Sequence, residues 1–174
     1  MKRKSILAYA VATTACVFAS FAFSAGRPND EGSPIFGVTI PAGYRQWELV
    51  APSHEAGSLD ELRGILGNAI AMKAYREGTL PFPDGAIIAK LAWKHTLSAE
   101  DDEALGHPQA FVPGHATTLQ FMVKNSKKYA STGGWGFGRF IDGKPVDEAQ
   151  HRTCFPCHAA YAKAHDFVFT NYAP

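Results

Sequence analysis

The stretch Cys154-Phe155-Pro156-Cys157-His158, close to the end of the 174-residue chain, decides how the rest of the sequence is interpreted. Two cysteines separated by two residues and followed at once by a histidine are typical of a site that attaches a c-type haem. In such a site two thioether bonds fix the porphyrin edge, and the histidine binds the iron. The pattern therefore predicts haem c attached through Cys154 and Cys157, with His158 as proximal iron ligand.

Two other interpretations of the motif are open. A zinc site would need two further Cys or His ligands; His151 and His165 are candidates, but the sequence contains no second C-x-x-C. A redox dithiol is expected early in a βαβ unit, whereas this motif lies near the C-terminus. The haem interpretation requires export, because haem c is attached on the far side of the membrane.

The first 24 residues have the composition of a secretory signal peptide. Residues 1–4 are positively charged, residues 6–23 are uncharged and mostly apolar, and Ala22 and Ser24 are the small residues that signal peptidase recognises. An uncleaved anchor helix is the alternative, since the apolar run is just long enough to span a bilayer. We expect a signal peptide at 1–24 and a periplasmic protein.

Cleavage changes the composition. Cys16 is lost, both remaining cysteines lie in the haem motif, and no structural disulfide is expected. Three of the 17 basic residues are lost while all 16 acidic residues remain, so the net charge becomes about −2. This charge is too weak to indicate a nucleic-acid partner. We expect a Gly/Pro/Ser-rich arm or linker at 25–43 and one haem domain at 44–174.

Hydrophobic periodicity and turn residues predict an α+β fold, with a mostly antiparallel sheet of about five strands and two or three helices. One helix begins after Asn68 and ends at Gly78, and a second runs over 146–163, carries the haem motif and bends at Pro156. Residues 95–116 are expected to form a loop with one helical turn, and residues 165–172 an extended tail. The expected strands are Tyr44–Val50, Leu62–Leu66, Ala86–Trp93, Thr117–Lys124 and Gly134–Ile141.

Two features of these strands are unusual. Lys90 lies in the middle of an apolar strand, where the ordinary interpretation is a lysine that protects a sheet edge. Gly134, Gly136 and Gly138 line one face of the last strand, which indicates that haem or a crossing helix approaches the backbone there.

A sixth iron ligand is not evident. Met72 and Met122 are the only methionines of the mature chain, and both are expected to fill the core. We therefore expect a five-coordinate iron with an open distal site, which binds small ligands and can convert them. The histidines that could also bind iron are His54, His95, His107, His115, His151 and His165.

The chain resembles the cytochrome P-460 family, in which haem is also cross-linked to a lysine. The order and spacing of motifs over most of the mature domain carry the resemblance, which implies an antiparallel sheet, a few helices and a homodimer. Relatives, the β-sheet cytochromes c′, keep the fold but lack that lysine. The matching motifs are Tyr44-Arg45-x-Trp47, Arg63, Asp84-Gly85-x4-Lys90, Val123-Lys124-x-Ser126-Lys127, Trp135-x-Phe137, Cys154-x-x-Cys157-His158 and Asp166-x-Val168-Phe169-Thr170.

The resemblance assigns roles to several residues. Lys90 matches the cross-linking lysine, with Lys94 as the only close competitor, and Arg63 matches an arginine near the distal pocket. The family places an acidic residue shortly before the haem motif, which makes Glu148 the candidate catalytic base. The alternatives are Asp147 and His151 as base, an ordinary acidic helix start at Glu148, and Phe121 and Phe137 as pocket walls or as plain core.

The family reaction implied is oxidation of hydroxylamine to nitric oxide or nitrous oxide. It needs an open ferric site, a base for the N–H protons and an electron acceptor, for which we expect a soluble cytochrome. The alternative function is nitric oxide binding or carriage without turnover, as expected for a relative of the β-sheet cytochromes c′. Simple electron transfer would need a sixth ligand.

Overall fold

The structure, a computed structural model, describes residues 31–173. The signal peptide expected at 1–24 lies outside the described residues. Within the described part of the expected arm, Phe36 and Val38 are buried, so this segment belongs to the core of the domain. No helix between residues 31 and 173 is both long enough and apolar enough to cross a membrane.

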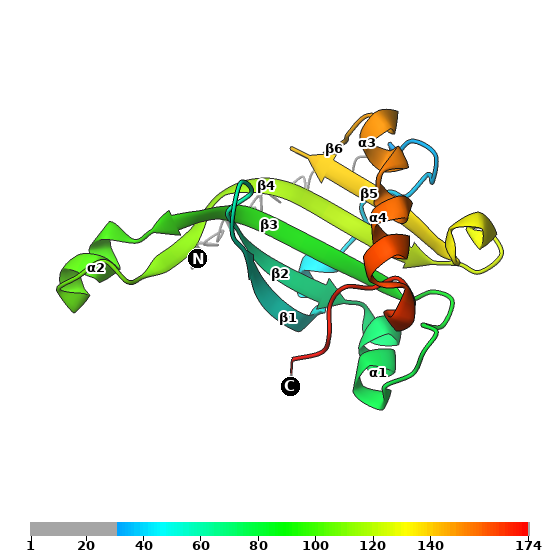
Figure 1. The fold of residues 1–174 in the computed structure, drawn as a ribbon, viewed down its shortest axis with the longest axis horizontal. Helices are drawn as coiled ribbons and strands as arrows, with labels where there is room; N and C mark the ends of the chain where they lie inside the picture. The colour runs from blue at the N-terminus through cyan, green and yellow to red at the C-terminus, as the bar shows by residue number, and fades with distance from the viewer. Residues whose placement is uncertain (1–30, 174) are drawn as a thin grey trace, which may run out of the picture.

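Over residues 31–173 the chain folds around one antiparallel sheet whose six strands follow one another in sequence order (Figure 1). This architecture confirms the predicted α+β class. The strands are β1 (Glu48–Glu55), β2 (Glu61–Gly67), β3 (Ile87–Leu97), β4 (Phe111–Lys124), β5 (Trp135–Ile141) and β6 (Lys144–Pro145). The α-helices are α1 (Ala69–Glu77), α2 (Ala99–Leu105), α3 (Glu148–Arg152) and α4 (Cys154–Tyr161).

The β2–α1 unit confirms its prediction. Asn68 caps α1 by accepting a hydrogen bond from the Ala71 N–H, and Gly78 ends the helix in a left-handed conformation. The Asn68 side chain also accepts from the Ile87 N–H and donates to the Gly85 carbonyl. One side chain therefore joins the start of α1 to the start of β3.

Two predictions for the strands were wrong. Residues Tyr44–Gln46 form a short 3-10 helix, η1, and β1 begins only at Glu48. Residues 95–116 are not mainly a loop, because β3 and β4 continue as a projecting hairpin with α2 at its tip (Figure 1). The helical turn that was expected in this segment is confirmed by α2, which Ser98 caps. Backbone pairing, as between Leu97 and Phe111, stabilises this hairpin without the apolar alternation that marks a half-buried strand.

The single helix predicted over 146–163 is two helices that meet at Thr153. The break precedes Pro156, which lies in the first turn of α4, where its missing N–H leaves no hydrogen bond unmade. After α4 the short 3-10 helix η3 (Lys163–His165) leads into an irregular tail, which does not add a strand among the described residues. The Ala173 N–H donates to the Val50 carbonyl of β1.

The glycine face of β5 is covered by side chains, and not by haem or a helix. A Cβ on Gly136 would overlap the ring of Tyr129, and one on Gly138 would press against Val38 and Phe140. Tyr129 is buried and its hydroxyl donates to the Phe36 carbonyl. The glycines therefore make room for the segment before η1 and for the β4–β5 connection.

We predict that Gly136→Ala lowers the free energy of unfolding by about 1–3 kcal/mol, because the added methyl group displaces the Tyr129 ring. Gly64→Ala is the matched control: its Cβ would meet the Trp93 ring at an ordinary 3.7 Å, and stability should be kept or slightly raised. Urea unfolding of both variants is the measurement. Equal stabilities would contradict the packing described for β5.

Candidate haem site

Helix α4 presents the residues of the predicted haem motif. Cys154, Cys157 and His158 are at positions i, i+3 and i+4, so they share one side of the helix. Both thiols are free; Cys154 is half-buried and Cys157 is exposed. Burial raises the pKa of the Cys154 thiol.

The imidazole of His158 is held in one orientation. Its Nδ1 lies 2.7 Å from the Phe167 carbonyl, which can only accept, so Nδ1 carries the proton and Nε2 keeps its lone pair. The rings of Phe137 and Phe169 lie 4.9 Å and 4.8 Å from the imidazole ring. Burial lowers the pKa of His158, which favours the neutral form that binds metals.

The Phe167 carbonyl is in turn positioned by Asp166. The Asp166 carboxylate accepts from Lys124 Nζ at 2.8 Å and from the Phe82 N–H at 2.9 Å. Its main-chain carbonyl accepts from Trp135 Nε1 at 2.7 Å. The Lys124–Asp166 ion pair is almost fully buried, so the tail is fastened to the sheet directly beside α4.

The sheet turns Lys90 toward this helix. Lys90 is paired with Ile65 of β2 and Gln120 of β4, so it lies on a central strand, and its interpretation as an edge lysine was wrong. Burial, and then the charge of Arg63, lower the pKa of Lys90 to about 8. Lys90 is also close enough to Cys154 and His158 for its charge to act on both.

Lys94 has a different environment. Its Nζ donates to the main-chain carbonyl of Leu59 at 2.5 Å, in the turn between β1 and β2. Of the two lysines considered for a cross-link, Lys90 is the one that the structure brings to α4.

Arg63 lies on the same face of the sheet as Lys90, two residues before its partner Ile65. The Arg63 guanidinium pairs with Glu61 at 2.8 Å and with Glu55. Burial, followed by the charge of Arg139, lowers the pKa of Arg63. The structure thus places the predicted Arg63 near Lys90, with Arg139 as a second arginine.

Glu61 was missed as a site residue by the sequence interpretation. It is buried, and both carboxylate oxygens are occupied: Oε2 accepts from Arg63, and Oε1 accepts from Thr117 Oγ1 at 2.6 Å. The signal that could have found it is the strand alternation, which puts Glu61, Arg63 and Ile65 on one face.

The candidate base Glu148 lies on the surface. Its side chain is 56% exposed and pairs with Arg152 one turn along α3. Asp147 caps α3 by accepting from the Gln150 N–H, and His151 is fully buried, where its Nε2 accepts from the Arg139 N–H. These contacts account for Asp147 and His151 as structural residues, while the role of Glu148 stays a prediction.

The two phenylalanines considered as pocket walls lie on opposite faces of the sheet. Phe137 packs against His158 and Phe155 of α4. Phe121 packs against Tyr44 and Phe140 and belongs to the core on the other face. Met72 is also fully buried in the core, as predicted.

The residues on this face fit a haem. α4 offers two free thiols and an imidazole whose Nε2 can bind iron, which is the donor set that a covalently attached haem uses. The facing sheet carries the cationic side chains of Lys90, Arg63 and Arg139, which would complement the anionic propionates of a haem. Among residues 31–173, Arg139 Nε is buried without a hydrogen-bond partner, which an incoming acceptor group would satisfy.

An antiparallel sheet whose partly buried lysine faces two thiols and an oriented histidine suits a haem protein. The family model Cytochrome P460 matches residues 41–170, so the chain belongs to the cytochrome P460 family and is a haem-binding cytochrome. A comparison with curated proteins found no match.

We predict that Asp166→Asn lowers the free energy of unfolding by about 3–5 kcal/mol, because it leaves the buried Lys124 charge unpaired. Glu77→Gln, which breaks the exposed pair with Lys73, is the control and should change it by less than about 0.5 kcal/mol. Chemical unfolding compares the two. Similar losses would show that Asp166 does not fasten the tail.

Proposed function

We propose that this protein is a periplasmic oxidoreductase that oxidises hydroxylamine to nitric oxide or nitrous oxide. In this proposal haem c is attached through Cys154 and Cys157, bound by His158 and cross-linked to Lys90. Membership of the cytochrome P460 family supports a haem-dependent oxidation. The observation that carries the proposal is the position of Lys90, which is partly buried on a central strand and close enough to Cys154 and His158 for its charge to act on both.

The environment of Lys90 favours a bond to haem. With a pKa near 8, an appreciable fraction of its amine is neutral at neutral pH and carries a lone pair. A bond from this amine to a haem carbon would replace one amine N–H and one haem C–H by a C–N bond, and two protons would be released to solvent. The two electrons released would pass to an oxidant of the peroxide or dioxygen class.

Side chains of the protein would orient the substrate and take up its protons. The bound haem would supply a coordination position for the substrate nitrogen and would accept its electrons. Arg63, held by Glu61 and Glu55, would donate its remaining N–H groups to a ligand on the Lys90 face. Glu61 already accepts three hydrogen bonds, two from Arg63 and one from Thr117, so its part in the site is to hold Arg63 in place.

Glu148 remains the proposed base. Its only hydrogen-bond partner among the described residues is Arg152, and such an exposed pair is weak enough to release the carboxylate for proton transfer. Glu148 is the first residue of α3, the helix that comes directly before α4. Electrons would leave to a soluble cytochrome, and we expect the protein to act as a homodimer.

A second function is favoured by one observation, the exposure of Glu148. If no free carboxylate reaches the ligand, the site would bind nitric oxide without turning it over. The protein would then be a nitric oxide carrier, even with the cross-link in place.

We predict that Lys90→Leu loses more than about 90% of hydroxylamine oxidation, because the third bond between protein and haem is missing while both thioethers remain. Turnover is measured with an artificial electron acceptor, and haem content by pyridine haemochrome. Lys94→Leu, which removes the neighbouring lysine, should keep normal activity. Normal turnover by the Lys90 variant would refute the proposed mechanism.

We predict that Glu148→Gln lowers kcat by about 100-fold or more, as expected when a general base is removed. Arg152→Gln breaks the same surface pair without removing the carboxylate and should keep kcat. Steady-state assays of both variants give the comparison. Unchanged turnover in Glu148→Gln would refute the assignment of Glu148 as the base. It would not contradict the proposed oxidation on a cross-linked haem.

A further inference from the structure

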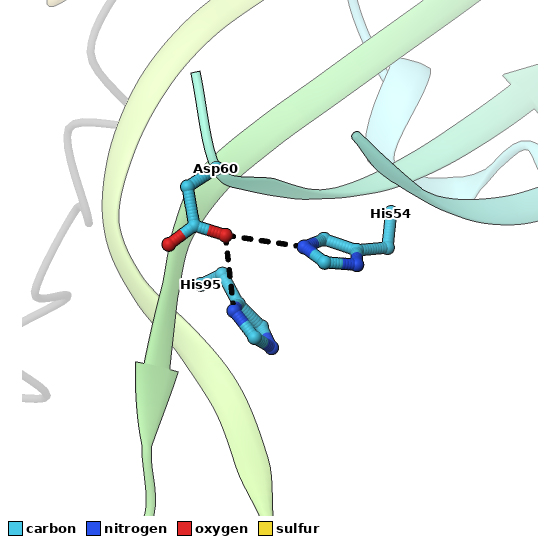
Figure 2. Close-up of side chains that lie close together, drawn as sticks. All are labelled: His54, Asp60 and His95. Atoms are coloured by element: carbon cyan, nitrogen blue, oxygen red, sulfur yellow. Dashed lines mark hydrogen bonds and ion pairs between the residues drawn. The ribbon is translucent and has the colours of Figure 1, made fainter. Parts of the chain in front are cut away.

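Three potential metal ligands meet at the far end of β1, away from α4. His54 is near the end of β1, Asp60 precedes β2, and His95 lies in the projecting part of β3. His54 pairs with Leu62, which pairs with Trp93, so strand alternation places His54 and His95 on the face opposite Lys90. Figure 2 shows both imidazoles converging on one carboxylate oxygen of Asp60.

The distances suit a shared ion. Asp60 Oδ1 lies 3.1 Å from His54 Nε2 and 3.1 Å from His95 Nδ1, and all three atoms lie within 4.8 Å of one another. Zinc binds such atoms at about 2.0–2.2 Å, which separates tetrahedral ligands by about 3.3 Å. Small shifts of these side chains would therefore surround an ion.

The backbone holds the cluster in place. The His95 N–H donates to the Asp60 carbonyl at 3.0 Å, so the turn that carries Asp60 is tied to β3. Asp60 adopts a positive φ of 44°, which the hydrogen bond to β3 helps to hold. The His95 ring stacks on Phe111 of β4 at 4.0 Å, and it is 4.3 Å from the His54 ring.

We propose that His54, Asp60 and His95 bind a divalent late transition-metal ion, through His54 Nε2, His95 Nδ1 and Asp60 Oδ1. Two imidazoles and one carboxylate suit Zn²⁺, Cu²⁺ or Ni²⁺, whereas Mg²⁺ and Ca²⁺ prefer oxygen ligands. Three protein ligands leave a fourth position to water.

The alternative is that the same contacts are only hydrogen bonds between histidine and aspartate. Half of the Asp60 side chain is exposed, and an ion pair at such a place adds little stability. A metal site would differ from it by taking up one ion per chain, and by losing that ion when any one of the three ligands is removed.

The test is calorimetric titration of Zn²⁺ into the mature, haem-loaded protein after treatment with a chelator. We expect one Zn²⁺ per chain, and a loss of more than about 10-fold in affinity for His54→Ala, His95→Ala and Asp60→Asn, since even groups that only orient a ligand contribute about 10–100-fold. His107→Ala removes an exposed histidine outside the cluster and should bind Zn²⁺ like the unaltered protein.

Thermal unfolding gives a second measurement on the same proteins. Zn²⁺ should raise the Tm of the unaltered protein and of His107→Ala, but not that of His54→Ala, because an ion stabilises only a fold that binds it. Equal Zn²⁺ affinity in the unaltered protein and in the three cluster variants would overturn the proposal. So would the absence of stoichiometric uptake. Neither result depends on hydroxylamine turnover.

Discussion

The buried ion pair between Asp166 and Lys124 is the interaction on which the site depends. Between α4 and residue 173 the chain has no regular secondary structure of its own, apart from one 3-10 turn, and it must be fastened to the sheet by side chains. Asp166 does this through Lys124, the Phe82 N–H and the Trp135 indole. The next residue, Phe167, then holds His158 in the orientation that binds iron.

The sheet forms the wall of the haem site opposite α4. It also separates that site from the histidine–aspartate cluster on its other face. Its α4 face carries Lys90, Arg63 and Arg139, a group of partly buried cations whose mutual repulsion is relieved in part by Glu61. Such a group is costly to bury without anionic partners, which the haem propionates would supply. The other face carries aromatic core residues and, at its far end, the histidine–aspartate cluster.

Local signals in the sequence predicted much of this fold. The Asn68 cap and the Gly78 stop define α1, and the haem motif was identified from its spacing alone. The role of Lys90 required the family resemblance, because spacing cannot tell a central strand from an edge strand. The projecting β3–β4 hairpin was missed, since a ladder with water on both sides has no apolar alternation to reveal it. Glu61 was recognised as a site residue only from the structure, in which it accepts a hydrogen bond from Arg63.

The ferrous absorption spectrum of the mature, haem-loaded protein tests the central claim most directly. A bond between Lys90 and the haem should move the Soret band far to the red of an ordinary c-type haem, and a haem-containing peptide that includes Lys90 should then be found by mass spectrometry. An ordinary five-coordinate c-type spectrum would contradict the account. Lys90 would then be a structural lysine, and nitric oxide binding would become the better description of the site.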